Sequence, residues 1–391
     1  MIPFEQALKI IESSVSPLPA ESMPFTQVLN RVLAQEVVSD ADMPPFNKSA
    51  MDGYACRKTD LGNALEIIDL IPAGKLPSRT IGPDQCARIM TGAMVPPGAD
   101  FVLMKEHVGI NASGKVYRLK ESENENICYR GEDLKAGDTI LIPGTRLLPA
   151  HLAMLAAVGC THPRVHKTPR VAVLSTGNEL VEPAQIPGAG KIRNSNGYQL
   201  VAQVSHMGLS SAYLGIAPDE ASTLEGILSD ALEKFDVVLI SGGVSVGDYD
   251  YVPEVLRKLE VEPLFHGINV KPGRHLLFGK RGSCTVVGMP GNPVSSFVQF
   301  EVLVKPLLNL LMGCVAKPVK LRLPLEQAYV RKKPDTLFFI PVDITENGTA
   351  LPLEYHGSAH IHAYTRAGGI MEVPVGVSEI NKGDLVDVRP L

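Results

Sequence analysis

The sequence contains no tryptophan, and aromatic residues make up only 5% of its 391 residues. This scarcity disfavours proteins that bind single-stranded nucleic acid by stacking bases on aromatic side chains. The net charge is −5, and the lysines and arginines are spread along the chain, so no basic face indicates binding to nucleic acid or to an anionic membrane. We therefore expect small-molecule partners.

The cysteine pattern excludes two further classes of site. No C-x-x-C pair occurs, and the cysteines lie far apart in the sequence. This spacing argues against a zinc site and against a disulfide framework, and it fits a protein of the reducing cytosol. Six thiols are therefore expected to be buried or inert: Cys56, Cys86, Cys128, Cys160, Cys284 and Cys314.

Long hydrophobic runs are also missing. No apolar run approaches the roughly 20 residues that a membrane-spanning helix needs. The N-terminal segment MIPFEQALKIIESSV contains two glutamates and no early basic cluster, unlike a signal peptide. It places Phe4, Ala7, Leu8 and Ile11 on one helical face. We expect a soluble, cytoplasmic protein with a packing helix at its N-terminus.

The residue composition and the pattern of apolar runs change along the chain and predict a multidomain α/β plus β fold. Proline, glycine and short β-prone runs dominate residues 39–135, which indicates a β insert domain. The flanking segments 1–38 and 136–168 predict one small, discontinuous helical domain. Strand-like and helix-like runs alternate over 169–315, which predicts a doubly wound parallel-sheet domain. Short strands over 316–391 predict a C-terminal β domain.

The run DVVLISGGVSVGDYDY combines a glycine-rich loop with two aspartates and no lysine. Its apolar start predicts a buried strand, and Ser241, Gly242 and Gly243 could turn backbone N–H groups toward an anion. A phosphate-binding Walker loop would add a lysine, whereas this loop adds Asp248 and Asp250. These carboxylates repel phosphate unless a metal ion or another cation intervenes.

Three loops should meet at one edge of the predicted parallel sheet, because ligands bind outside the carboxyl ends of such strands. STGNE, residues 175–179, and PGNPVS, residues 290–295, follow apolar runs as the SGG loop does. Asn292 and Pro293 are placed to begin a helix that extends to about Leu311. The missing positive charge could come from NVKPGRH, where a lysine and an arginine flank Pro-Gly. The residues that we single out on this edge are Ser175, Thr176, Gly177, Glu179, Lys271, Arg274 and Pro290.

Other candidates have a structural interpretation beside the functional one. Asp219 follows a strand on the same edge, or it caps the next helix. Thr91 lies in IMTGAMVPPGAD, which resembles a loop held close to a ligand. The acidic segments around Asp52 and Asp133 could be solvated turns. The histidines of SAHIHAY are expected on one face of a strand, and two histidines alone do not make a metal site.

Taken in order, NKSAMDGYA, IMTGA, VPPGAD, RGEDLKAG, LSTGNELV, SGGVSVGDYDY, VKPG and GMPGNPVSSF resemble the signature series of the molybdopterin molybdenumtransferase family. This family includes the C-terminal domain of gephyrin. The resemblance spans nearly the whole chain. It implies an elongated homodimer of four-domain subunits, with a site between the doubly wound domain of one subunit and the β domain of the other.

The implied reaction joins adenylylated molybdopterin with molybdate or tungstate, inserts the metal into the dithiolene and releases AMP. The resemblance implies Mg²⁺ between Asp52, Asp250 and the pyrophosphate. Such an ion would explain how a loop that carries aspartates can lie next to phosphate. An adenylyltransferase that supplies the substrate is a further expected partner. The carried-over functional residues are Asp52, Thr91, Asp133, Glu179, Asp219, Asp250, Lys271, Pro290, Pro293 and Ser358.

One departure concerns the oxyanion. The family usually offers an arginine in a K-x-G-R motif, and this chain has Thr336 in its place. Two alternatives to the transferase remain: a scaffold that binds molybdopterin without turnover, and a hydrolase of small nucleotides. The retained acids argue against the first, and the ordered motifs argue against the second.

Overall fold

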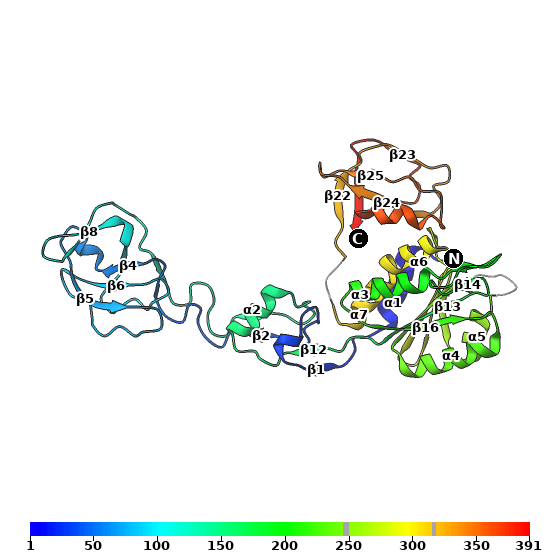
Figure 1. Ribbon diagram of the computed structural model, residues 1–391, viewed down its shortest axis with the longest axis horizontal. Helices are drawn as coiled ribbons and strands as arrows, with labels where there is room; N and C mark the ends of the chain where they lie inside the picture. Colours follow the sequence, from blue (N-terminus) through cyan, green and yellow to red (C-terminus); the bar gives the residue numbers. More distant parts are fainter. Residues whose placement is uncertain (245–249, 315–317) are drawn as a thin grey trace. The chain divides into compact units, whose positions relative to one another are not determined.

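The computed structural model describes residues 1–244, 250–314 and 318–391 (Figure 1). These residues form two compact units, which we describe separately. The first contains residues 1–34, 143–148 and 164–391, and the second contains residues 35–142 and 149–163. The four domains expected from the sequence are a finer division than these units, and their boundaries stay a prediction.

A six-stranded sheet forms the centre of the first unit, with its strands in the order β16-β13-β17-β21-β20-β18. The first four strands are parallel, as expected, whereas β20 is antiparallel to both of its neighbours, β21 and β18. Only residues 282–283 join β20 to β21, too few for the crossover that a parallel pair needs. The bounds are β13 Val171–Thr176, β16 Ser211–Ala217, β17 Val237–Ser241, β18 Glu262–His266, β20 Leu277–Arg281 and β21 Cys284–Met289.

The central strands of this sheet carry two hydrophobic cores, one on each face. On β13, Val171 and Val173 belong to one core, and Ala172 and Leu174 belong to the other. This alternation follows from the two-residue period of an extended strand. Every residue of β13, β17 and β21 is buried. The apolar runs that predicted buried strands are therefore confirmed.

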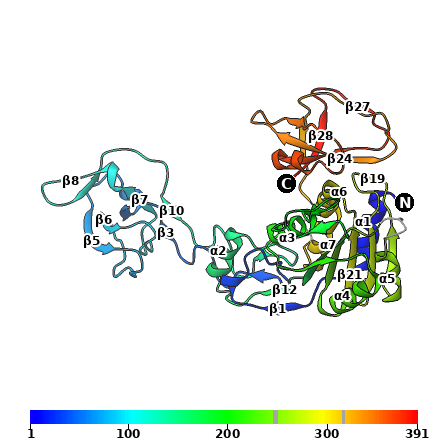
Figure 2. The same ribbon diagram turned by 45° about the vertical axis from the view of Figure 1, so that its right-hand side comes forward.

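Helices cover both faces of the sheet (Figures 1 and 2). Leu224 of α4 and Val252 of α5 pack in one core, whereas α1, α3, α6 and α7 contribute to the other. The expected N-terminal helix is confirmed, with Phe4, Ala7 and Ile11 buried. The bounds are α1 Phe4–Ser14, α3 Asn196–His206, α4 Ala221–Lys234, α5 Val252–Lys258, α6 Pro293–Gln299 and α7 Lys305–Leu311.

A π-helical turn, Phe300–Val304, joins α6 to α7, so that one helix of 19 residues runs from Pro293 to Leu311. Pro293 lies in its first turn, as expected. This helix is long and apolar enough to cross a membrane by length and composition alone, although it contains Glu301 and Lys305 and is not a continuous apolar run. However, 67% of its apolar window is buried inside the structure, and residues such as Val298 and Leu307 belong to a core of the α/β sheet. We therefore interpret it as a core helix.

A second sheet of the first unit consists mainly of C-terminal residues. Its strands lie in the order β19-β24-β26-β28-β22, and β25 pairs with β24. The runs VKLRLPL, LFFIPVDI and DLVDVRPL form β22, β24 and β28, as expected. The bounds are β19 Val270–Lys271, β22 Leu321–Pro324, β23 Tyr329–Val330, β24 Leu337–Ile344, β25 Ala350–Pro352, β26 Gly369–Val373, β27 Glu379–Ile380 and β28 Leu385–Pro390.

The expected strand in SAHIHAY is wrong. Residues Ile361–Arg366 form a 3-10 helix, and His360 precedes it. Ile361 and Tyr364 both pack on a hydrophobic core, and their spacing of three residues suits the 3-10 period rather than a strand. The His360 and His362 rings stack with their centroids 6.2 Å apart.

The second unit contains the expected β domain, with a sheet in the order β5-β6-β4-β7. LEIIDLI, ADFVLMK and GKVYRL form β5, β7 and β9, as predicted, and helix α2 is Pro149–Ala157. The strands of this unit are β2 Val37–Val38, β3 Lys48–Ser49, β4 Gly53–Cys56, β5 Glu66–Ile71, β6 Gln85–Ile89, β7 Phe101–Met104, β8 Val108–Ile110, β9 Val116–Arg118, β10 Ile127–Cys128 and β11 Thr139–Leu141. The remaining short strands, of the first unit, are β1 Ala20–Ser22, β12 Arg164–His166, β14 Leu180–Val181 and β15 Ile192–Arg193.

Candidate functional site

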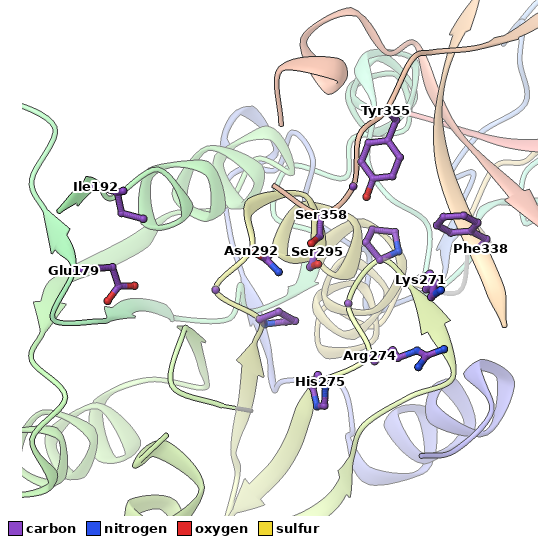
Figure 3. A pocket seen from close by; sticks show the side chains of 15 residues that line it. Glu179, Ile192, Lys271, Arg274, His275, Asn292, Ser295, Phe338, Tyr355 and Ser358 are labelled. Atoms are coloured by element: carbon purple, nitrogen blue, oxygen red, sulfur yellow. The ribbon is translucent and has the colours of Figure 1, made fainter. Parts of the chain in front are cut away.

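A cavity of about 720 Å³ lies in the first unit, between the loops of the doubly wound sheet and the C-terminal β sheet (Figure 3). Its walls come from the loop after β13, the segment after β19, the β21–α6 turn and the C-terminal sheet. Six lining residues were singled out from the sequence: Glu179, Lys271, Arg274, Pro290, Asn292 and Ser358. The others are Ile192, Pro272, Gly273, His275, Gly291, Ser295, Phe338, Tyr355 and Gly357.

Backbone hydrogen bonds fasten the C-terminal sheet to the rim of this cavity. β19 pairs in parallel with β24, which places Lys271 opposite Phe338. The N–H of Val294, in the first turn of α6, donates to the carbonyl oxygen of Ser358 at 3.0 Å. The Asn269 side chain donates to the Asp335 carbonyl oxygen, also at 3.0 Å. The cavity therefore lies between the α/β sheet and a C-terminal sheet that includes β19, a strand from the chain segment between β18 and β20.

The cavity is rich in groups that attract an anion. Lys271, Arg274 and His275 lie within one five-residue segment of its wall, and Glu179 is the one acid among the described lining residues. The Arg274 Nε is buried and has no hydrogen-bond partner in the described part of the chain. A buried guanidinium N–H without an acceptor is costly, so a ligand oxygen at this position would be stabilised.

Glu179 lies directly against the loop that precedes it. A Cβ on Gly177 would come within 2.6 Å of the Glu179 carboxylate, and the φ of Gly177 is +148°. A side chain at residue 177 is therefore excluded as long as the glutamate keeps this position. The glycine of STGNE serves to bring this carboxylate close to the backbone at the carboxyl end of β13.

The serine and threonine of STGNE lie behind the cavity rather than in its wall. Ser175 is fully buried, and its hydroxyl donates to Asn194 Oδ1 at 3.2 Å. Thr176 is also buried, and its Oγ1 has no hydrogen-bond partner in the described part of the chain. The Ser175 hydroxyl therefore joins the end of β13 to the segment before α3, whereas the Thr176 hydroxyl makes no such connection among the described residues.

The SGG loop packs on the STGNE loop at backbone distance. Gly242 has a φ of +95°, and a Cβ there would lie 2.4 Å from the Thr176 carbonyl oxygen. Gly243, with a φ of +65°, would bring a Cβ within 2.7 Å of Thr176 Oγ1. Both glycines are thus required by conformation and by space. Asp248 lies outside the described residues, whereas Asp250 is described and half-buried.

Asp219 contacts the STGNE loop and does not cap a helix, so the capping interpretation is wrong. α4 begins at Ala221, and Glu220 occupies its N-cap position. The Asp219 carboxylate instead accepts a hydrogen bond from the N–H of Asn178 at 3.0 Å. The Asn178 side chain accepts in return from the N–H of Asp219 at 3.2 Å. The structure therefore joins these two loops at the sheet edge.

In the second unit, two of the expected functional residues contact each other. Asp52 Oδ1 accepts hydrogen bonds from the N–H and the hydroxyl of Thr91, each at 2.8 Å, and Lys105 Nζ lies 3.3 Å from Oδ2. The backbone N–H and the hydroxyl of Thr91, followed by Lys105, lower the pKa of Asp52 to about 2. Asp133 is exposed in a turn, and its N–H donates to the Met43 carbonyl oxygen.

The departure at Thr336 leaves no arginine in the cavity wall at that position. Thr336 is 1% exposed, and its Oγ1 has no hydrogen-bond partner among the described residues. Arg331, five residues earlier, donates to the carbonyl oxygens of Thr336 and Val377. Burial lowers the pKa of Arg331. Neither residue is among the described residues that line the cavity.

Sequence reasoning missed several polar and aromatic residues of this region. Asn194 and Asn196, on either side of the start of α3, bind the loops at the sheet edge. The signal that could have revealed them is the run NSN, residues 194–196, which lies at the start of α3 and follows the STGNE loop in the chain. Phe338 and Tyr355 gave no such signal, because the pairing of β24 with β19 brings them to the cavity from the C-terminal sheet.

Three family models match the chain in succession. Residues 2–159 match "MoeA N-terminal region (domain I and II)", residues 172–310 match "Probable molybdopterin binding domain", and residues 325–391 match "MoeA C-terminal region (domain IV)". The three models together cover most of the chain.

Similar proteins extend over the full length of the chain. A molybdopterin molybdenumtransferase of Staphylococcus aureus is 33% identical, over 99% of this chain and 95% of its own length. The enzyme of the same name from Staphylococcus epidermidis is 34% identical with the same coverage. The crystal structure of a molybdopterin biosynthesis moeA protein from Pyrococcus horikoshii OT3 is 30% identical, covers 100% of both chains and has a TM-score of 0.85. The chain belongs to the MoeA family of molybdopterin molybdenumtransferases.

Proposed function

We propose that this protein inserts molybdate or tungstate into adenylylated molybdopterin and releases AMP, which completes molybdenum cofactor synthesis. The observation that carries the proposal is the cavity at the carboxyl ends of the parallel strands, where Lys271, Arg274 and Ser358 meet. The names of the full-length relatives support the same reaction.

The oxyanion is the substrate that best fits the positively charged wall. A tetrahedral dianion loses its hydration on entering a pocket and needs donors in return. The Lys271 ammonium, the Arg274 guanidinium and the Ser358 hydroxyl can supply them, and the Arg274 Nε is available because no described residue accepts from it. These donors take the place of the arginine that other family members offer where this chain has Thr336.

The aromatic walls suit the other half of the substrate. Phe338 and Tyr355 line the cavity from the C-terminal sheet, and Figure 3 shows the Tyr355 side chain on the cavity side of its backbone. Burial raises the pKa of Tyr355 to about 12, so the phenol is neutral at physiological pH. Flat heterocycles such as a pterin pack well against neutral aromatic faces. We assign the pterin to this side of the cavity.

Mg²⁺ fits the acids that follow the glycine-rich loops. The described residues contain no group of three or more His, Cys, Asp or Glu side chains that could hold a metal ion. Mg²⁺ commonly uses only one or two carboxylates together with phosphate oxygens and water. Asp52 and Asp250 would hold it with the substrate, and the ion would neutralise phosphate charge. Asp133, Glu179 and Asp219 are proposed to act beside them.

The proposed assembly is a cytoplasmic homodimer. Asp52, Thr91 and Asp133 belong to the second compact unit, whereas Asp250 and the cavity belong to the first. A site shared between subunits would combine the two sets, as the family resemblance implies. An adenylyltransferase that delivers the adenylylated substrate is the proposed protein partner.

The decisive experiment measures AMP. The protein is incubated with adenylylated molybdopterin and Mg²⁺, with molybdate, with tungstate or with neither oxyanion. We expect AMP release that depends on the oxyanion and is matched by formation of the metal cofactor. AMP release that does not require an oxyanion would favour the nucleotide hydrolase, and tight substrate binding without AMP release would favour the scaffold.

A further inference from the structure

Asn196 links the end of β17 to the loop after β21. It is the first residue of α3 and is 8% exposed. Its Nδ2 donates to Ser241 Oγ, at the last residue of β17, and to the Gly291 carbonyl oxygen, in the loop after β21, each at 2.8 Å. An amide nitrogen has two hydrogens, so these two bonds use its full donor capacity.

Asn194 makes the matching connection to the third loop. Its Oδ1 accepts from the Ser175 hydroxyl at 3.2 Å and from the N–H of Gly197 at 3.1 Å. Its Nδ2 donates to the Tyr213 hydroxyl at 2.7 Å, which in turn donates to Glu182. The start of α3 is therefore hydrogen-bonded to the carboxyl ends of β13 and β17 and to the loop after β21.

The start of the SGG loop is fixed to β21 by one main-chain bond, from the N–H of Gly242 to the Met289 carbonyl oxygen at 3.0 Å. Gly242 and Gly243 follow Ser241, and both have positive φ angles. A glycine backbone has more conformational freedom than any other, so the energy that fixes such a loop must come from its neighbours. At this edge the described side-chain bonds that cross between the SGG and PGN loops come from Asn196.

We propose that Asn196 is a positioning residue, which holds the end of β17 and the loop after β21 at the separation that binds the nucleotide part of the substrate. The inference rests on the proposed function, since it takes this sheet edge as the nucleotide site. The residue acts through Ser241 and Gly291 rather than by touching the substrate. Its loss should weaken nucleotide binding more than it weakens the fold.

Gln203 provides a matched control on the same helix. It is also 8% exposed, and its Nε2 donates to the Phe297 carbonyl oxygen and to Glu301. These partners belong to the long helix of residues 293–311 and not to the ligand loops. Gln203→Ala therefore removes a buried amide of the same kind without releasing the SGG or PGN loop.

The experiment compares the wild type with Asn196→Ala, Asn196→Asp and Gln203→Ala. Aspartate keeps the shape of asparagine and is favoured near a helix N-terminus, but an ionised carboxylate cannot donate to Gly291. AMP affinity in the presence of Mg²⁺ is measured by titration calorimetry, and unfolding is followed by circular dichroism. Amide hydrogen exchange of the peptides around residues 241 and 291 reports on the loops directly.

Both Asn196 variants should lose at least about tenfold in AMP affinity and show faster exchange at the two loops. Gln203→Ala should stay within about twofold of the wild type. In turnover by the Asn196 variants, the KM for adenylylated molybdopterin should rise while the KM for molybdate stays unchanged. The segment that contains Lys271 and Arg274 has its own anchor, because Gln299 donates to the Gly273 carbonyl oxygen.

Two outcomes would overturn the inference. One is wild-type AMP affinity in Asn196→Asp, which would mean that the side chain only fills space. The other is an equal loss in Gln203→Ala, which would mean that general loosening of α3 is responsible. A wild-type protein that binds no AMP would instead contradict the proposed function, and the exchange measurement would still report whether Asn196 couples the loops.

Discussion

Individual hydrogen bonds set the ionisation state of acidic residues in the proposed site. Asp52 is only half-buried, yet two bonds from Thr91 and the nearby Lys105 ammonium keep its carboxylate ionised far into the acid range. The sequence could place Asp52 and Thr91 in loops, but they are 39 positions apart, and no local pattern reveals that they meet. Their contact depends on the antiparallel pairing of β4 with β6.

We predict that Thr91→Val raises the pKa of Asp52 by roughly half a unit, because the hydroxyl donor is lost and the backbone donor remains. Since the folded pKa lies below the ordinary value near 4, the carboxylate stabilises the fold above that value, and this contribution is lost as pH falls toward about 2. Carbon-13 NMR titration of the aspartate carboxyls measures the shift. Asp42, which is held by Ala136 and Arg130, should not change. An unchanged Asp52 would contradict the hydrogen bonding described here.

A second prediction at this scale concerns the oxyanion. Arg274→Ala should weaken molybdate and tungstate binding by about tenfold or more, because the cavity loses a charge and a buried donor. Titration calorimetry with each oxyanion measures the effect. Arg281→Ala is the control, since Arg281 lies on β20, outside the described cavity lining. Unchanged oxyanion binding in Arg274→Ala would remove this residue from the proposed site.

At the scale of elements, the hydrophobic pattern predicted more than the polar pattern did. The buried runs of β13, β17 and β21 and the start of the helix at Pro293 were readable, because a strand or helix buried on a core is set by local periodicity. The reversed direction of β20 and the 3-10 helix after His360 were not foreseen. Both depend on short connections and on packing against distant segments.

The loop geometry leads to a prediction about glycine. Gly242→Ala should destabilise the protein by about 1–3 kcal/mol and abolish AMP binding, because the new methyl group would meet the Thr176 carbonyl at a positive φ. Gly226→Ala, in the middle of α4 with open space around it, should stabilise by about 0.5–1 kcal/mol. Urea denaturation of both variants measures the two effects. A Gly242→Ala protein as stable as the wild type would mean that the two loops are not packed as described.

For the whole molecule, the separation of the acids leads to a complementation test. Asp52→Ala and Asp250→Ala should each be inactive, because either substitution removes a proposed Mg²⁺ ligand. Mixing them should restore activity at up to about a quarter of the sites, since half the dimers are mixed and one site in each is intact. Oxyanion-dependent AMP release after subunit exchange is the measurement. Demonstrated exchange with no activity would show that the site is not shared between subunits.

The pairing of β19 with β24 places Lys271 in two parts of the structure at once. By chain order it belongs to the α/β domain, and by hydrogen bonding it belongs to the C-terminal sheet. A rotation of that sheet about its attachment would carry the ammonium group with it, together with Phe338 opposite. An oxyanion bound by both Lys271 and Arg274 would therefore connect a strand of the C-terminal sheet to the segment that leads back to β20.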